Sequence, residues 1–136
     1  MGSGRMILLD THAWIWWLAS PRRLSKSAAA AIDQAVNGAG VYVSAISAWE
    51  MAMLVRKGRL ELTMDVADWI AAAESLPYLH SVPVTSRVAA MSVELQDYAH
   101  PDPADRIIIT TAMTMNARLI TKDEKILSYP HVRALW

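Results

Sequence analysis

The 136-residue sequence contains no cysteine, and its 13 basic and 13 acidic side chains balance to a formal net charge of zero. Without cysteine, disulfide scaffolds and thiolate metal sites are excluded. Proteins that coat nucleic acids non-specifically usually have a strongly basic surface, so a neutral chain has to make any such contact through local patches. Two basic patches are present, Arg22-Arg23-Lys26 and Arg56-Lys57-Arg59, although each is more typical of a solvent-exposed helix end.

Long apolar runs are also absent. Hydrophobic residues make up 54% of the chain, yet no uncharged stretch reaches the roughly 18 residues that a membrane helix needs. No secretory signal is recognisable, and Met1-Gly2-Ser3-Gly4-Arg5 is typical of a leader added for expression, with natural translation beginning at Met6. We therefore expect a single domain over residues 6–136, located in the cytoplasm without membrane contact, with an apolar surface patch that suits a partner.

Short apolar runs alternate with segments of helical periodicity along the whole chain. This alternation predicts an α/β fold in which a mostly parallel sheet has helices on both faces. The expected strands are 7–9, 41–43, 81–84, 118–121 and 132–136. The expected helices are 11–19, 25 or 27 to 36, 44 or 47 to 57, 66–74, 87–95 and 104–116, with a short helical turn at 124–127.

Four acidic residues, Asp10, Glu50, Asp105 and Asp123, stand beside these elements, and each has an ordinary structural explanation. Asp10 and Asp123 follow expected strands, where a carboxylate can cap the next helix. Glu50 lies three residues after Ser47, a spacing that matches a capping box. Asp105 ends the stretch DPAD, which matches a helix start with an N-cap, a proline at the first position and an acid at the third.

The joint arrangement of these acids indicates more than helix capping. The carboxyl ends of parallel strands meet at one edge of the sheet, where ligands bind, so Asp10 and Asp123 should lie close together. Glu50 and Asp105 share helical faces with apolar residues, and an inward-facing carboxylate is costly unless it is paired or bound to a cation. Oxygen ligands without cysteine suit Mg²⁺ or Mn²⁺, and such sites commonly act on phosphates.

Around these acids the sequence resembles the PIN-domain family, specifically the VapC-type toxins of bacterial toxin–antitoxin pairs. The matching segments occur in the family's order and span nearly the whole chain. They are LLDTHAWIWWL, SAISAWEMAML, HPDPADRIIITTA and LITKDEKIL. The third segment followed by the fourth is fairly specific, and the four together are a strong signal.

The resemblance implies a PIN-like three-layer sandwich and a Mg²⁺- or Mn²⁺-dependent endoribonuclease. It implies that the catalytic and metal-binding residues are Asp10, Glu50, Asp105 and Asp123. Asp105 is favoured over Asp102 because it directly precedes the apolar helix, as the family's acid does. The resemblance also implies a homodimer and a cognate VapB-type antitoxin that blocks the site and brings the DNA-binding half of the complex.

Several neighbouring residues have two interpretations. The hydroxyls of Thr11 and Thr121 either orient a carboxylate or a water, or belong to turns. His12 is more typical of a turn residue than of a metal ligand. The helix at 11–19 is apolar on all sides, so its tryptophans pack in the core, bind a partner or stack on a base.

Two rival functions are compatible with parts of the sequence. A hydrolase that forms a phosphoaspartate also begins with a strand ending in aspartate, but that chemistry typically needs a second acid two positions later, where this chain has His12. A catalytically inert PIN-like module would bind RNA or protein without cleaving RNA. The presence of all four acids disfavours the inert module.

Overall fold

The structure is a computed structural model that describes residues 6–136. Its elements follow the order β1 (Ile7–Leu9), α1 (Thr11–Ala19), η2 (Pro21–Arg23), α2 (Lys26–Val36), β2 (Val41–Ser44), α3 (Ala45–Arg56), α4 (Val66–Glu74), β3 (Leu79–Val82), α5 (Ser86–Val93), α6 (Pro103–Met115), β4 (Arg118–Ile120), α7 (Glu124–Leu127) and β5 (Ala134–Leu135). The leader expected at residues 1–5 lies outside the described residues. Across residues 6–136, no helix combines the length and the apolar character that crossing a membrane requires.

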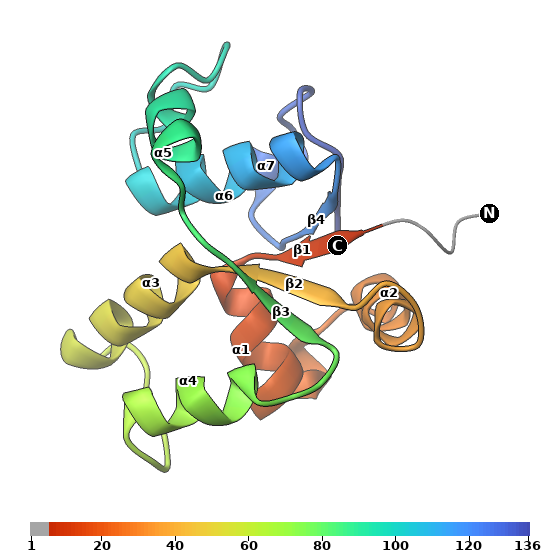
Figure 1. Cartoon of the computed structure of the whole chain (residues 1–136), viewed down its shortest axis with the longest axis vertical. Helices are drawn as coiled ribbons and strands as arrows, with labels where there is room; N and C mark the ends of the chain where they lie inside the picture. Colours follow the sequence, from red (N-terminus) through yellow and green to blue (C-terminus); the bar gives the residue numbers. More distant parts are fainter. Residues whose placement is uncertain (1–5) are drawn as a thin grey trace.

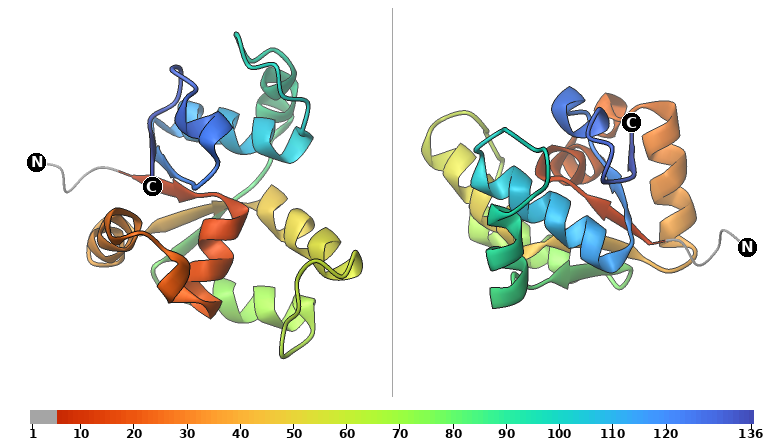
Figure 2. Two further views of the ribbon diagram at one scale, coloured as in Figure 1. Left: turned by 180° about the vertical axis from the view of Figure 1, so that it is seen from behind. Right: turned by 90° about the horizontal axis from the view of Figure 1, so that it is seen from above.

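The strands form one sheet in the order β3-β2-β1-β4-β5, and every neighbouring pair is parallel. Helices α1, α2 and α4 lie on one side of this sheet and α5, α6 and α7 on the other, which confirms the expected three-layer α/β fold (Figures 1 and 2). From β1 the chain moves outward through β2 and β3, and then returns to the opposite side of β1 for β4 and β5. In such sheets a crevice opens at the carboxyl ends of the strands where the order reverses, here between β1 and β4.

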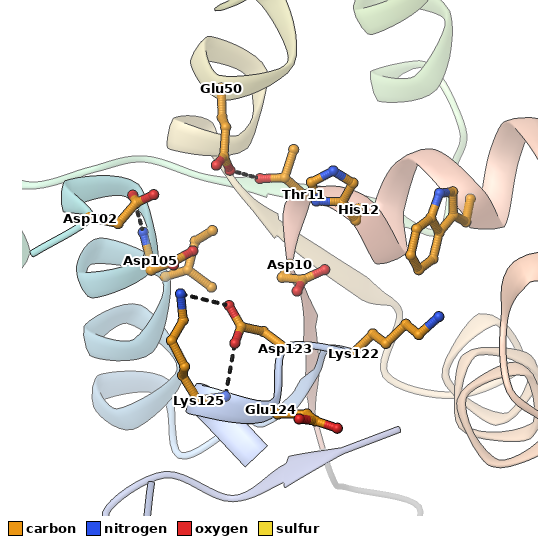
Figure 3. Close-up of a pocket in the computed structure, with 12 residues that line it drawn as sticks. Asp10, Thr11, His12, Glu50, Asp102, Asp105, Lys122, Asp123, Glu124 and Lys125 are labelled. Atoms are coloured by element: carbon orange, nitrogen blue, oxygen red, sulfur yellow. Dashed lines mark hydrogen bonds and ion pairs between the residues drawn. The ribbon is translucent and has the colours of Figure 1, made fainter. Parts of the chain in front are cut away.

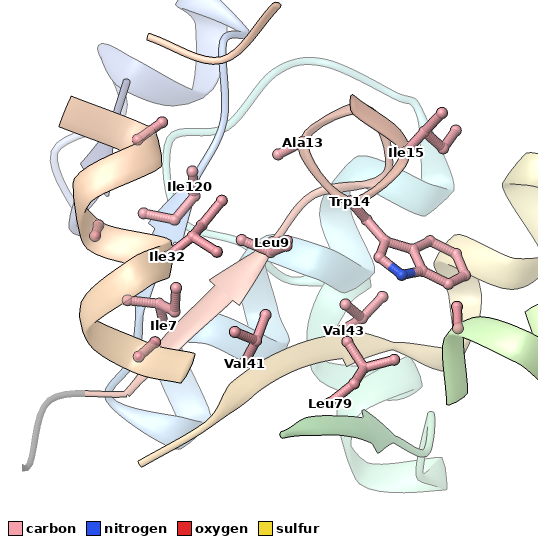
Figure 4. Packing of buried hydrophobic residues seen from close by; sticks show 14 of the residues in the cluster. Ile7, Leu9, Ala13, Trp14, Ile15, Ile32, Val41, Val43, Leu79 and Ile120 are labelled. Carbon is pink, nitrogen blue, oxygen red and sulfur yellow. The ribbon is translucent and has the colours of Figure 1, made fainter. Parts of the chain in front are cut away.

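Alternate side chains of the central strands supply two separate cores. Ile7 and Leu9 of β1 belong to the cluster under α1 and α2, whereas Leu8 between them belongs to the cluster under α6. Strand β4 repeats this division, with Ile120 in the first cluster and Leu119 in the second. The division follows from the two-residue period of a strand, and Figure 4 shows the first cluster. A sheet covered on both faces explains why these strands read as unbroken apolar runs.

All expected elements are present, with ends that lie within two residues of the expected ones. Helices α1 and α4 begin and end at the expected residues. Strand β3 was expected at 81–84 but spans Leu79–Val82, because it pairs with β2 from Leu79 onward and stops before Pro83, which has no amide hydrogen to donate. The short 3-10 helix η2 was not expected.

The turn between α2 and β2 depends on Gly40, which is buried and has a φ of +93°. A Cβ atom here would lie 2.5 Å from Nε2 of His80 and 3.2 Å from the carbonyl oxygen of Tyr78. Gly58 also has a positive φ, +71°, but nothing lies within 4 Å of its Cβ position. The two glycines therefore allow backbone strain to be separated from steric conflict.

We expect Gly40→Ala to lower the free energy of unfolding by about 2 kcal/mol or more, and Gly58→Ala by about 1 kcal/mol, because only the first adds a clash to the strained φ. Urea denaturation of both variants measures the difference. In a His80→Ala background, the losses of unfolding free energy caused by the two glycine substitutions should become more similar. Equal losses for the two variants in the natural background would contradict this account of the turn.

Candidate functional site

A pocket of about 590 Å³ lies at the carboxyl ends of β1 and β4, where the strand order reverses. The structure brings all four sequence-predicted acids into its lining, together with Asp102. Figure 3 shows that these side chains surround a common space although they come from four separate parts of the chain. The acids that line the pocket are Asp10, Glu50, Asp102, Asp105, Asp123 and Glu124.

Asp10 connects β1 to α1 and is held through both of its carboxylate oxygens. Its backbone N–H donates to the carbonyl of Ile120 at 3.0 Å, which continues the pairing of β1 with β4. Oδ1 accepts the N-cap bond from the N–H of Ala13 at 2.8 Å, and Oδ2 accepts a hydrogen bond from the hydroxyl of Thr121. Burial raises the pKa of Asp10, and these two hydrogen bonds oppose the rise in part.

Glu50 lies in the second turn of α3 and contacts α1 through Thr11. The buried Thr11 donates its hydroxyl to Oε1 of Glu50 and lies 2.9 Å from the hydroxyl of Ser47. The capping-box explanation of Glu50 is wrong, because Ser44 caps α3 by accepting from the N–H of Ile46 at 3.1 Å. Hydrogen bonding to α1, rather than capping of α3, therefore orients the carboxylate of Glu50.

Asp102 and Asp105 both stand at the start of α6. Asp102 is the N-cap, and its Oδ1 accepts from the N–H groups of Ala104 at 2.9 Å and Asp105 at 3.2 Å. Pro103 occupies the first helical position, as the sequence predicts. One carboxylate oxygen from each of Glu50, Asp102 and Asp105 lies within 4.8 Å of the other two, which is close enough for one metal ion to contact all three.

Asp123 caps the short helix α7. Its Oδ1 accepts from the N–H of Lys125 at 2.9 Å, and its Oδ2 lies 3.9 Å from Nζ of the same lysine. Its own N–H donates to the hydroxyl oxygen of Thr121 at 3.1 Å. Because that hydroxyl also donates to Asp10, Thr121 links the two acids that follow the adjacent strands β1 and β4.

The pocket carries more negative than positive charge, with six carboxyl groups against two lysines, Lys122 and Lys125. Burial raises the pKa of Asp105 to about 7, and the charges of the neighbouring acids add to the rise. Without a cation, Asp105 therefore holds its proton to a higher pH than an ordinary aspartate does. A divalent cation would displace this proton and relieve the repulsion, and the oxygen-only donor set suits Mg²⁺ or Mn²⁺.

Sequence reasoning missed part of the lining. Asp102 was treated as a neighbour of the site, although its spacing of three residues before Asp105 places both acids on the first turn of α6. Lys122 and Trp16 also line the pocket, and no local pattern marks them as pocket residues. His12 is exposed on α1, with its ring 5.6 Å from that of Trp16.

Comparison with protein families agrees with this fold and this site. The model of the PIN domain matches residues 7–132 of the chain. The chain belongs to the PIN-domain family, as its four motifs indicate. It is 39% identical over 127 residues to Ribonuclease VapC22 of Mycobacterium tuberculosis, an alignment that covers 93% of this chain and 94% of that protein.

Two solved structures illustrate the shared fold. VapBC2 from Rickettsia felis, bound to a DNA fragment from their promoter, matches with a TM-score of 0.70 at 16% identity, over 96% of this chain and 97% of that chain. FitAcB from Neisseria gonorrhoeae matches with a TM-score of 0.68 at 24% identity, again over 96% and 97%. At these identities the likeness establishes the fold.

Asp105 should make the metal-free protein less stable as the pH rises. Its pKa is about 7 in the folded chain against 3.8 for an ordinary aspartate, so the folded state binds this proton more tightly. The resulting stabilisation is fully present below pH 3.8 and is lost as the pH rises through about 7.

We therefore expect Asp105→Asn to raise the Tm of the chelator-treated protein at pH 8 and to change it little at pH 4, where both side chains are neutral. Thermal unfolding followed by circular dichroism at the two pH values measures the effect. Asp33→Asn, which alters an exposed acid of α2, is the matched control. An equal gain at both pH values, or in the control, would count against this electrostatic account.

Proposed function

We propose that this chain is a Mg²⁺- or Mn²⁺-dependent endoribonuclease, a VapC-type toxin that a cognate VapB-type antitoxin inhibits. The observation that carries the proposal is the gathering of carboxylates around a pocket whose basic side chains are too few to balance their charge. The 39% identity to a ribonuclease over nearly the whole chain supports RNA as the substrate. We also propose that residues 6–136 form a single domain.

The catalytic and metal-binding set in this proposal is Asp10, Glu50, Asp105 and Asp123. Glu50, Asp102 and Asp105 each bring one carboxylate oxygen within 4.8 Å of the other two, and both N-cap bonds of Asp102 go to its Oδ1. Carboxylate oxygens are the ligands that Mg²⁺ and Mn²⁺ prefer. The excess negative charge of the pocket supports a divalent rather than a monovalent cation.

A bound divalent cation would polarise the scissile phosphate and lower the pKa of a water molecule. In the proposed reaction a carboxylate of the pocket accepts a proton from that water as the water oxygen attacks phosphorus. The bond between phosphorus and O3′ breaks, and O3′ takes a proton from solvent, which leaves a 5′-phosphate and a 3′-hydroxyl. Thr11 and Thr121 keep Glu50 and Asp10 in fixed orientations through their hydroxyl hydrogen bonds.

The proposed partners are an RNA substrate, a VapB-type antitoxin and a second copy of the chain. Similarity to the VapBC2 complex supports the antitoxin. Trp49, which directly precedes the pocket residue Glu50 on α3, has 55% of its surface exposed and supplies apolar surface for a partner. We propose that the antitoxin covers this region and contacts DNA itself, and that the toxin forms a homodimer.

Asp10→Asn should abolish metal-dependent cleavage without unfolding the chain. Asparagine can still accept the N-cap bond from Ala13, but it lacks the negative charge. We expect RNA cleavage to slow by about a hundredfold or more, because metal-assisted catalysis contributes several kcal/mol of transition-state stabilisation. Gel assays of total RNA with and without Mg²⁺ measure the loss, and Asp33→Asn serves as the exposed control.

Full metal-dependent activity in a folded Asp10→Asn variant would refute the role of the acid cluster. An inert PIN-like module would give a different result. The natural chain, freed of antitoxin, would then neither bind Mn²⁺ at millimolar concentration nor cleave RNA.

Thr121 should act as a positioning residue for two acids. Thr121→Val keeps the shape of the side chain but removes the hydroxyl that contacts Asp10 and Asp123, and we expect cleavage to slow by about tenfold. Thr121→Ser keeps the hydroxyl and should retain most of the activity. A loss in the serine variant as large as that in the valine variant would instead assign Thr121 to packing through its methyl group.

A further inference from the structure

One wall of the acidic pocket is aromatic and basic. Trp16 of α1 lines the pocket, and two cations lie over its indole ring. The guanidinium carbon of Arg23, from η2, is 4.7 Å from the ring centroid, and Nζ of Lys122, from the segment after β4, is 5.7 Å away. We call these three residues the Trp16 cluster. His12 and Trp136 flank the same ring at 5.6 Å and 5.7 Å.

Packing alone does not account for this cluster. Trp14 on the same helix is almost fully buried, whereas Trp16 remains partly exposed, and both of its cations are exposed. Trp17 is a useful contrast, because it is also partly buried against the same core but packs at a tilt against Tyr78 and does not line the pocket. Trp16 is therefore the tryptophan of α1 that a molecule entering the pocket would meet.

The chemistry of the cluster matches one nucleotide unit. An indole offers a flat face on which any base can stack, and stacking does not depend on charge. Arginine and lysine contact phosphates, and they release the indole face readily because an exposed cation–π contact is weak. The acidic centre of the pocket repels phosphates, so Lys122 in the lining and Arg23, which contacts Trp16 but is not itself a lining residue, offer the binding charge that the centre lacks.

We propose that Trp16, Arg23 and Lys122 form a subsite for single-stranded RNA, in which an unpaired base stacks on Trp16 and the two cations contact neighbouring phosphates. This inference rests on the proposed function, because it assumes that RNA enters the pocket. Bases in a duplex are already stacked on one another, so the subsite selects unpaired RNA. An acidic protein segment would pair with the two cations but would offer no planar group to stack on the indole once they release it.

Binding of a fluorescent single-stranded RNA oligonucleotide, followed by anisotropy in the Asp10→Asn background with Mg²⁺, tests the subsite without cleavage. We expect Trp16→Leu to weaken binding by about fivefold to a hundredfold, the range expected for the loss of one stacked base. Trp17→Leu removes a similar partly buried indole and should change the Kd by less than about twofold. Trp16→Tyr keeps a ring that can stack and should restore most of the affinity.

The cations are tested through the salt dependence of the same Kd. Arg23→Gln and Lys122→Gln should each reduce the slope of log Kd against log salt by about 0.7, the value for one phosphate contact on a single strand. Arg87→Gln alters an exposed arginine at the start of α5 that does not line the pocket and lies in neither basic patch, and it should leave the slope unchanged. A blunt duplex of the same sequence should have the same Kd for the protein that keeps Trp16 and for the Trp16→Leu variant.

Equal Kd values for Trp16→Leu and Trp17→Leu in folded proteins would overturn the subsite. Competition by an acidic peptide as strong as that by an oligonucleotide of equal charge would also overturn it, because it would assign the cluster to a protein segment. Cleavage by the natural chain is measured separately. If the natural chain cleaves RNA but Trp16→Leu leaves the Kd unchanged, only the subsite is refuted. If Trp16→Leu weakens binding but the natural chain does not cleave RNA, the subsite is supported and the nuclease function is refuted.

Discussion

Repulsion between carboxylates is the interaction on which the rest of this structure depends. Three side chains bring carboxylate oxygens within 4.8 Å of one another, and the two lysines of the pocket do not balance the six acids that line it. The folded chain tolerates this arrangement because several of these acids stand at helix starts, where backbone N–H groups and the helix dipole stabilise negative charge. The repulsion that remains favours the binding of a divalent cation.

Helix capping and the proposed active-site role are therefore not alternative explanations of the same residues. Asp10, Asp102 and Asp123 are the N-caps of α1, α6 and α7, and all three line the pocket. The cap bonds of Asp10 and Asp123 fix their carboxylates just after β1 and β4, and those of Asp102 fix its carboxylate at the start of α6. The local signal that begins each helix therefore also positions a charged oxygen in the pocket. Glu50 caps no helix, and Thr11 of another helix orients it.

Local features of the sequence were enough to predict much of the fold and the four acids. A strand followed by aspartate is visible at Asp10 and at Asp123, and helix ends follow from caps and prolines. Strand order is not visible in the same way, because alternating apolar segments do not specify that β4 returns beside β1. The contact between Thr121 and Asp10, 111 residues apart, and the approach of Asp102 to Glu50 both depend on that order.

An acidic pocket in a neutral chain imposes a condition on an anionic substrate such as RNA. With a net charge of zero, the molecule has no overall field that attracts a polyanion, and salt screens exposed charges beyond about 8 Å. Affinity then has to come from short-range contacts beside the acids, through stacking and through cations at the rim. The fold provides both kinds of contact, because α1 carries Trp16 six residues after Asp10 and the segment after β4 carries Lys122 directly before Asp123. The carboxyl ends of β1 and β4 therefore bring together both the acidic side chains and the groups that offset their charge.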